Sequence, residues 1–234
     1  MFIVEKDFES EICFIHMYKC AGMSILKSLR NENLLNEQES HIHNSLYKYY
    51  NKDYSINISL VRNPLTWYKS LVNYEISRIE DELGINLFAR YFIFEDYPND
   101  NRNMDFNMSI DRMINMKDFF KEHPHQLQHF KDELKENKYS NRMVMNIFNI
   151  KTLDDIENMK LEETYYQEMI KRFGIYDTTF YRMEDELKKA TDILGIKELV
   201  HININKKNNS LSDIQLETIK NKDKELFDKF GYKL

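Results

Sequence analysis

The stretch "FIHMYKCAGMSI" (residues 14–25) carries residues that could bind an anion. An apolar run ends at Lys19, which supplies a positive charge, and small residues follow that let the backbone fold tightly: Cys20, Ala21 and Gly22. Successive backbone N–H groups in such a turn, with the start of the next helix, form an anion-binding concavity. Ser24 could cap that helix or donate its hydroxyl to the anion. An ordinary strand–turn–helix connection with a solvated lysine would explain the same residues, and the phosphate-loop pattern G-x-x-x-x-G-K-[ST] is missing.

A second stretch, "SLVRNPLTWYKSLVNY" (residues 59–74), adds an arginine at a predicted strand end. Arg62 precedes a helix that Pro64 opens, and Ser70 follows eight residues after Arg62, about two helical turns along. An arginine fork and a hydroxyl could clamp a second phosphate. A surface ion pair and a serine on a helix face are the alternative interpretation.

Histidines are the side chains best suited to accept a proton near neutral pH. "SHIHNSLYKYY" offers His41 and His43, between the two loops, although exposed or capping histidines would read the same way. His16 falls within the first predicted strand, where a satisfied strand residue is the more common role.

A third group of histidines lies in "KEHPHQLQHF" (residues 121–130), which holds His123, His125 and His129. Three histidines this close could bind a metal, but no regular ligand spacing with further ligands is visible. A lid or acceptor-facing element is the preferred interpretation, and a solvated helix start is the alternative.

Composition limits the classes of protein. The chain has 234 residues, 42% hydrophobic and 31% charged, and no apolar run approaches the roughly 20 residues of a membrane span. The acidic start "MFIVEKDFESE" does not resemble an export signal, and two cysteines suggest neither a disulfide framework nor a metal site, which favours a cytoplasmic protein. A net charge of −6 argues against general nucleic-acid binding but allows one local anion pocket.

Apolar strands alternate with helices along the chain. We expect strands over residues 11–17, 56–61, 178–181 and 201–204, and helices over 24–30, 45–50, 64–79, 109–120, 126–136, 161–172, 184–194 and 212–230. We expect Gly195 and Gly231 to end the last two helices. This order predicts an α/β fold whose parallel sheet binds ligands at the carboxyl ends of its strands. The middle third, roughly residues 84–172, is predicted to be a helical insertion or lid within one domain.

The two loops together resemble the nucleotide-binding signature of sulfotransferases that use 3′-phosphoadenosine 5′-phosphosulfate (PAPS). The first is similar to that family's 5′-phosphosulfate loop, HIPKTGGTS or HIPKTAGTS, and "LVRNPLTWYKSLVNY" is similar to its 3′-phosphate motif. "FYRMEDELKKATDILGI" (residues 180–196) resembles the family's late R-x-E-D-L helix, and residues 201–232 resemble its usual ending on F-G-Y. The motifs occur in the family's order over nearly the whole chain.

The resemblance implies a P-loop kinase-like three-layer sandwich and transfer of a sulfuryl group from PAPS, with 3′,5′-ADP as product and no metal required. Lys19 would stabilise charge on the bridging oxygen, and the backbone N–H groups of five residues would hold the 5′-phosphate: Cys20, Ala21, Gly22, Met23 and Ser24. Arg62 and Ser70 would hold the 3′-phosphate. The motif layout is most similar to the uronyl 2-O-sulfotransferase branch, whose His-x-His implies His43 as the base and His41 as its helper.

The sequence departs from the family pattern at several positions. Tyr18, Cys20 and Met23 replace a proline and two threonines of the first loop, which removes hydroxyl groups there. Trp67 stands where many relatives have a second arginine, and leaves Lys69 as a substitute. The loop "NKKNN" brings Lys206 and Lys207, which we interpret as solvated.

These observations favour a sulfotransferase acting on a hydroxyl of a carbohydrate or glycan-like acceptor. The acidic balance favours a neutral or lightly charged acceptor. Two alternatives stay open: a P-loop nucleotide-dependent kinase, and a non-catalytic nucleotide- or glycan-binding protein of the same fold. The sequence assigns no oligomeric state.

Overall fold

The structure is a computed structural model that describes residues 2–7, 10–17, 19–36, 56–80, 87–94, 97, 103–136, 152–173, 178–202 and 209–233. The chain forms two compact units. Unit 1 contains Met1–Asn63 and Phe173–Asn203, and unit 2 contains Pro64–Arg172 and Ile204–Leu234.

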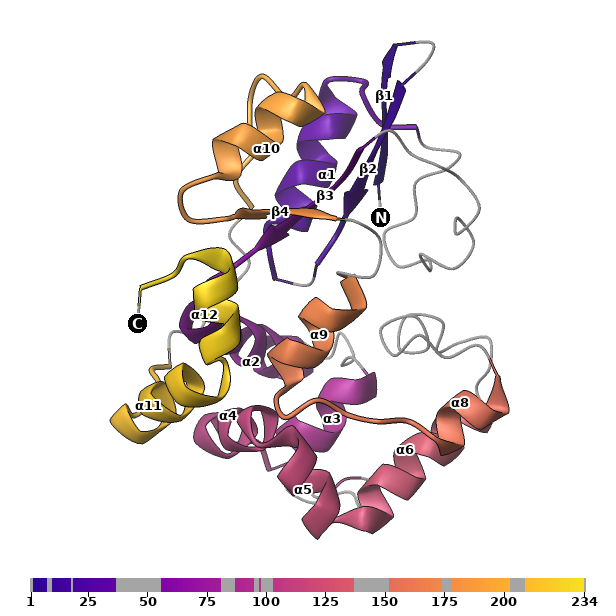
Figure 1. The fold of residues 1–234 in the computed structure, drawn as a ribbon, viewed down its shortest axis with the longest axis vertical. Helices are drawn as coiled ribbons and strands as arrows, with labels where there is room; N and C mark the ends of the chain where they lie inside the picture. The colour runs from indigo at the N-terminus through magenta and orange to yellow at the C-terminus, as the bar shows by residue number, and fades with distance from the viewer. Residues whose placement is uncertain are drawn as a thin grey trace. The chain divides into compact units, whose positions relative to one another are not determined.

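Unit 1 is an α/β unit built on a four-stranded sheet (Figure 1). Its elements are β1 (Phe2–Asp7), β2 (Ser10–Ile15), α1 (Gly22–Asn31), β3 (Ile56–Val61), β4 (Thr179–Arg182) and α10 (Leu187–Leu194). The strand order is β1-β2-β3-β4, in which β1 runs antiparallel to β2 and the other three strands are parallel. The carboxyl ends of β2, β3 and β4 therefore lie at one edge of the sheet.

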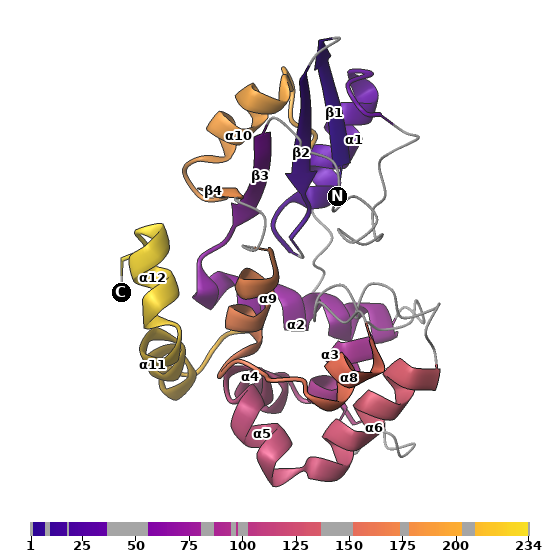
Figure 2. The same ribbon diagram turned by 45° about the vertical axis from the view of Figure 1, so that its right-hand side comes forward.

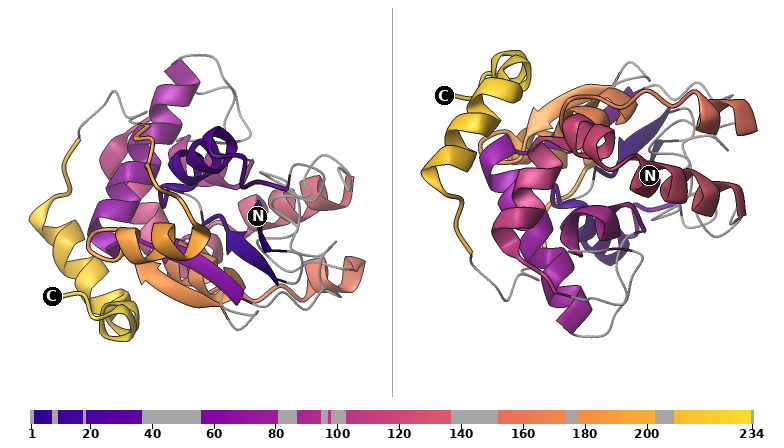
Figure 3. Two further views of the ribbon diagram at one scale, coloured as in Figure 1. Left: turned by 90° about the horizontal axis from the view of Figure 1, so that it is seen from above. Right: turned by 90° about the horizontal axis from the view of Figure 1, so that it is seen from below.

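The apolar runs of β2 and β3 form the core of unit 1. Ile12, Phe14, Ile58 and Leu60 are fully or almost fully buried, as expected for strands covered on their faces. The hydroxyl of Ser59 donates to the Ile15 carbonyl over 2.8 Å, so this buried polar group is paired. Figure 3 shows α1 and α10 on the same side of the strands.

The regular elements described in unit 2 are all helices (Figure 2), and an isolated antiparallel bridge joins Phe94 to Met104. Its elements are α2 (Pro64–Glu80), α3 (Leu87–Ile93), α4 (Phe106–Ile114), α5 (Met116–Glu122), α6 (Pro124–Glu136), α8 (Leu153–Glu157), α9 (Tyr165–Phe173), α11 (Asp213–Lys222) and α12 (Lys224–Phe230). Aromatic side chains dominate its core: Trp67, Tyr68, Tyr91, Phe92, Phe120, Phe130, Tyr165, Tyr166 and Phe227.

The α/β class, the parallel strands and many of the helices are confirmed. β3 matches its predicted bounds, and Gly195 and Gly231 end α10 and α12 with φ of 77° and 68°. Three strands of the sheet were predicted, whereas the antiparallel β1 was not. The predicted strand over 201–204 is wrong for His201 and Ile202, which belong to no strand. The predicted helix over 45–50 lies outside the described residues.

Some helix bounds also differ. The helix predicted over 109–120 is two helices that meet at Asn115, and the last predicted helix breaks at Asp223. The helices of the described residues are all too short or too polar to cross a membrane. A single domain with a lid over residues 84–172 stays a prediction.

Candidate functional site

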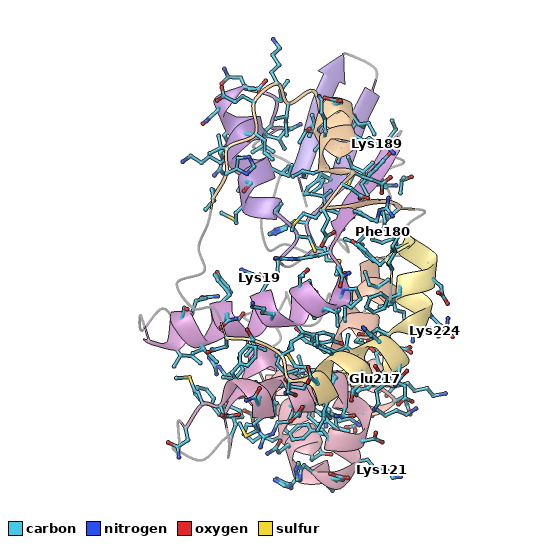
Figure 4. All side chains as sticks on the ribbon, turned by 90° about the vertical axis from the view of Figure 1, so that its left-hand side faces the viewer. Lys19, Lys121, Phe180, Lys189, Glu217 and Lys224 are labelled. Atoms are coloured by element: carbon cyan, nitrogen blue, oxygen red, sulfur yellow. The ribbon has the colours of Figure 1, made fainter. Side chains whose placement is uncertain are left out.

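The turn after β2 has the backbone conformation of an anion-binding concavity. Lys19 and Ala21 both adopt left-handed conformations, with φ of 64° and 56° (Lys19 is labelled in Figure 4). Ala21 is the N-cap of α1 and provides no side-chain cap, and the first backbone bond of the helix runs from Ile25 N–H to the Ala21 carbonyl. The backbone N–H groups of the first turn of α1 thus have no intrahelical acceptor. Left-handed residues before a helix start aim such groups at a common point.

Gly22 is required by the close approach of His16. A Cβ atom at position 22 would lie 1.7 Å from His16 Cδ2 and 2.0 Å from its Nε2. The imidazole is half-buried and follows β2 directly. His16 is therefore a packing residue of the turn rather than an interior strand residue.

Charged residues that follow three strands of the sheet act on the buried thiol of Cys20. Its side chain is fully buried, and burial raises the pKa of its thiol well above the usual value, so the thiol is not a nucleophile. The charges of Arg62, Glu184 and Lys19 also act on this thiol, in that order of size. Lys19 and Arg62 follow neighbouring parallel strands, because Ile15 of β2 pairs with Ser59 of β3.

The exits of β3 and β4 are joined by hydrogen bonds beyond the strands. Met183 N–H donates to the Val61 carbonyl over 2.7 Å, and Asn63 N–H donates to Glu184 Oε1 over 2.8 Å. Glu184 thus fixes the backbone on the far side of Arg62. It also brings a negative charge into a neighbourhood that otherwise holds Lys19 and Arg62.

A stripe on α1 holds the segment that follows α10. The side-chain oxygens of Ser24, Ser28 and Glu32, each four residues apart, accept hydrogen bonds from backbone N–H groups of that segment. Ser24 Oγ accepts from Ile202 over 3.2 Å and Ser28 Oγ from Val200 over 2.8 Å. Glu32 accepts from two consecutive residues over 2.9 to 3.1 Å, Lys197 and Glu198. Ser24 is therefore the acceptor in this contact.

Residues of the second motif beyond Pro64 belong to unit 2. Ser70 lies on α2 and is 5% exposed. Trp67 is fully buried and stacks on Tyr166, with ring centroids 4.4 Å apart. Trp67 is thus a core residue of unit 2, and Lys69 is half-buried on the same helix. Because Arg62 and Ser70 belong to different units, their pairing on one phosphate stays a prediction.

Five other sequence candidates lie outside the described residues: Tyr18, His41, His43, Lys206 and Lys207. The roles of His43 as base and His41 as helper stay predictions for that reason.

A buried carboxyl joins α9 to the α11–α12 junction within unit 2. Asp223 is fully buried, and its Oδ1 accepts a 2.7 Å hydrogen bond from Thr164. Burial raises the pKa of the Asp223 carboxyl to about 6, while the hydroxyls of Thr164 and Tyr68 oppose that rise. Gln167 Nε2 donates to the Lys222 carbonyl over 2.6 Å beside it.

Sequence reasoning missed four polar residues: Ser28, Glu32, Glu184 and Asp223. Their partners are backbone groups or side chains more than 50 residues away. Of the four, only Glu184 lies in a quoted motif, the R-x-E-D-L stretch, and it was given no role there. The spacing of Ser24, Ser28 and Glu32 on one helix face was a usable signal, since residues four apart are neighbours.

Comparisons of the chain with sequence models of protein families, with curated proteins and with solved structures find no match. The resemblance to sulfotransferases therefore depends on the sequence motifs.

Proposed function

We propose that this protein is a sulfotransferase that moves a sulfuryl group from PAPS to a hydroxyl of a carbohydrate or glycan-like acceptor. In this proposal the fold is related to that of P-loop kinases. The turn after β2 is the loop that binds the phosphosulfate. The site residues are those of the two motifs, with Lys19 and Arg62 as its main cations.

One observation carries the proposal: the turn and Arg62 share a neighbourhood at the carboxyl edge of three parallel strands. Left-handed Lys19 and Ala21 precede a helix whose first N–H groups have no side-chain cap. Lys19 and Arg62 follow the neighbouring parallel strands β2 and β3, in which Ile15 pairs with Ser59. Two anionic groups of one nucleotide could be bound there, as PAPS requires and a single phosphate does not.

The chemistry follows from where charge develops. As the S–O bond of PAPS breaks, negative charge grows on the bridging phosphate oxygen. The Lys19 ammonium and the N–H groups of residues 21–24 would stabilise that charge. The Cys20 N–H, which the motif also predicted as a donor to the anion, instead donates to the Met17 carbonyl over 3.3 Å. Buried Cys20 contributes no hydroxyl, so backbone groups and Ser24 provide the hydrogen bonds of the loop.

Calorimetric titration of the full chain tests the nucleotide assignment. We expect 3′,5′-ADP to bind without Mg²⁺ and more tightly than Mg-ATP. Preference for Mg-ATP would instead support a kinase, and no binding of either nucleotide would support a binding protein of another kind. A screen of hydroxyl acceptors with labelled PAPS then tests transfer itself.

The Arg62→Ala variant tests the second anion site. We expect it to weaken 3′,5′-ADP by about 10- to 100-fold, the size of a lost charge-assisted hydrogen bond, and 5′-AMP far less. Arg30→Ala, at an exposed arginine on α1, is the matched control. Equal losses for the two nucleotides would remove Arg62 from the 3′-phosphate site.

A further inference from the structure

A chain of hydrogen bonds in unit 2 runs between α3 and α6. Tyr91 OH donates to Glu133 Oε2 over 2.9 Å, and Tyr97 OH donates to Glu133 Oε1 over 2.8 Å. Arg90 Nη1 donates in turn to Tyr97 OH over 3.4 Å. Tyr91 OH also lies 2.7 Å from His129 Nδ1.

Counting protons fixes the tautomer of His129. A tyrosine phenol is protonated near neutral pH and has one proton to donate. That proton is donated to Glu133, which leaves Tyr91 OH an acceptor toward His129. His129 Nδ1 must therefore carry a hydrogen, and in the neutral ring Nε2 carries the lone pair.

His129 thus has the arrangement of a metal-binding histidine. Such histidines commonly donate their second ring N–H to a carboxylate, a backbone carbonyl or water, which orients the ring and raises its basicity. Here the Tyr91 hydroxyl, which is bound to the Glu133 carboxylate, takes the place of that acceptor. The ring of His129 is half-buried, and none of the described residues forms a hydrogen bond with its Nε2. Glu133 lies four residues further along α6 and supplies the negative charge behind the ring.

A second imidazole is available on the same face of α6. His125 precedes His129 by four residues, and its side chain is exposed. Two histidines at this spacing on a helix can share one ion. Lys121, labelled in Figure 4, lies in the last turn of the preceding helix α5. His123 follows α5, and its ring packs edge-on against Phe119 with centroids 4.9 Å apart.

We propose that His125 and His129 form a surface site for a divalent transition-metal ion such as Zn²⁺, in which His129 coordinates through Nε2. Among the described residues, no group of three or more histidine, cysteine or acidic side chains is placed to hold a metal. Water completes the coordination shell, so the ion exchanges readily. Tyr91 and Glu133 are positioning residues of this site.

A calorimetric titration tests the proposal. Zn²⁺ is added to the metal-stripped full chain in a non-chelating buffer without nucleotide, and the heat of binding is measured. We expect His129→Ala to weaken Zn²⁺ binding by at least about 10-fold and Tyr91→Phe, which keeps the ring, by about 10-fold. His125→Ala should also weaken it, whereas His201→Ala, at an exposed histidine of unit 1, should not.

Nitrogen NMR of the His129 ring gives a readout independent of metal. Three results would support the site. In the metal-free protein Nδ1 carries the proton, and in Tyr91→Phe the ring loses its preference for that tautomer. Addition of Zn²⁺ changes the chemical shift of Nε2. Absence of Zn²⁺ binding, unchanged affinity in His129→Ala, or a proton on Nε2 in the neutral ring would overturn it. These outcomes do not depend on sulfuryl transfer.

Discussion

The two units hold their polar groups in different ways. In unit 1 the candidate site is made by the backbone: two left-handed residues, a glycine packed under an imidazole, and an uncapped helix start. In unit 2 the polar groups are side chains that pair across helices, as Tyr91 pairs with Glu133 and Asp223 with Thr164. A backbone site is encoded by a short stretch of sequence, whereas a side-chain network requires the fold to assemble it.

The largest effect that this comparison predicts concerns Lys19. Lys19→Ala should lower the turnover of sulfuryl transfer by about 100- to 1000-fold, the loss seen when one stabilising donor is removed from a developing charge. Transfer from labelled PAPS is the measurement, and Lys27→Ala on α1 is the matched control. Turnover at the wild-type level would show that the turn holds no reacting group.

Next in size is the effect of pH on unit 2 through Asp223. Its folded-state pKa of about 6 lies above the ordinary 3.8, so the folded state binds this proton more tightly. The stabilisation is complete below about pH 4 and is lost as pH rises through about 6, for a total of about 3 kcal/mol.

Denaturant unfolding of wild-type protein and Asp223→Asn at about pH 4.5 and about pH 7.5 measures this effect. We expect wild type to lose stability relative to Asp223→Asn at the higher pH, because the variant has no proton to release there. A difference between the two proteins that does not change with pH would exclude a raised pKa at Asp223.

A smaller effect is expected at the backbone of the turn in unit 1. Gly22→Ala forces a Cβ onto the His16 ring and should lower the free energy of unfolding by about 1–3 kcal/mol, as overpacking typically does. The double variant His16→Ala, Gly22→Ala removes the obstructing ring and should recover much of that loss. If the double variant is no more stable than Gly22→Ala, the packing of His16 is not what requires a glycine.

The smallest predicted effect is at the stripe on α1. Ser28→Ala removes the hydroxyl that accepts a hydrogen bond from Val200 N–H. The variant should lower the free energy of unfolding by about 1 kcal/mol. Ser210→Ala, at an exposed serine, should change stability little. If the free energy of unfolding changes equally in both variants, the stripe does not hold the segment after α10.

The fold could be predicted in large part where the signal was local. The run "INISLV" gives β3 its bounds, Pro64 opens α2, and two glycines end α10 and α12. The bend at Asn115 was missed because its apolar spacing continues through both helices. β1 was missed because its pairing with β2 depends on a partner strand, and "FIVEKD" carries charges like a loop.

The sequence by itself determined three strands of the sheet, many of the helices, the small residues of the turn and the cations of the two motifs. These are properties of residues close together along the chain. Local backbone preferences and the spacing of apolar residues set them directly. Tertiary structure alone decided that Glu184 accepts a hydrogen bond from Asn63, that Trp67 is a core residue, and that Tyr91 lies within hydrogen-bond distance of His129. Each of these depends on a partner brought close by packing, and no spacing along the chain encodes such a distance.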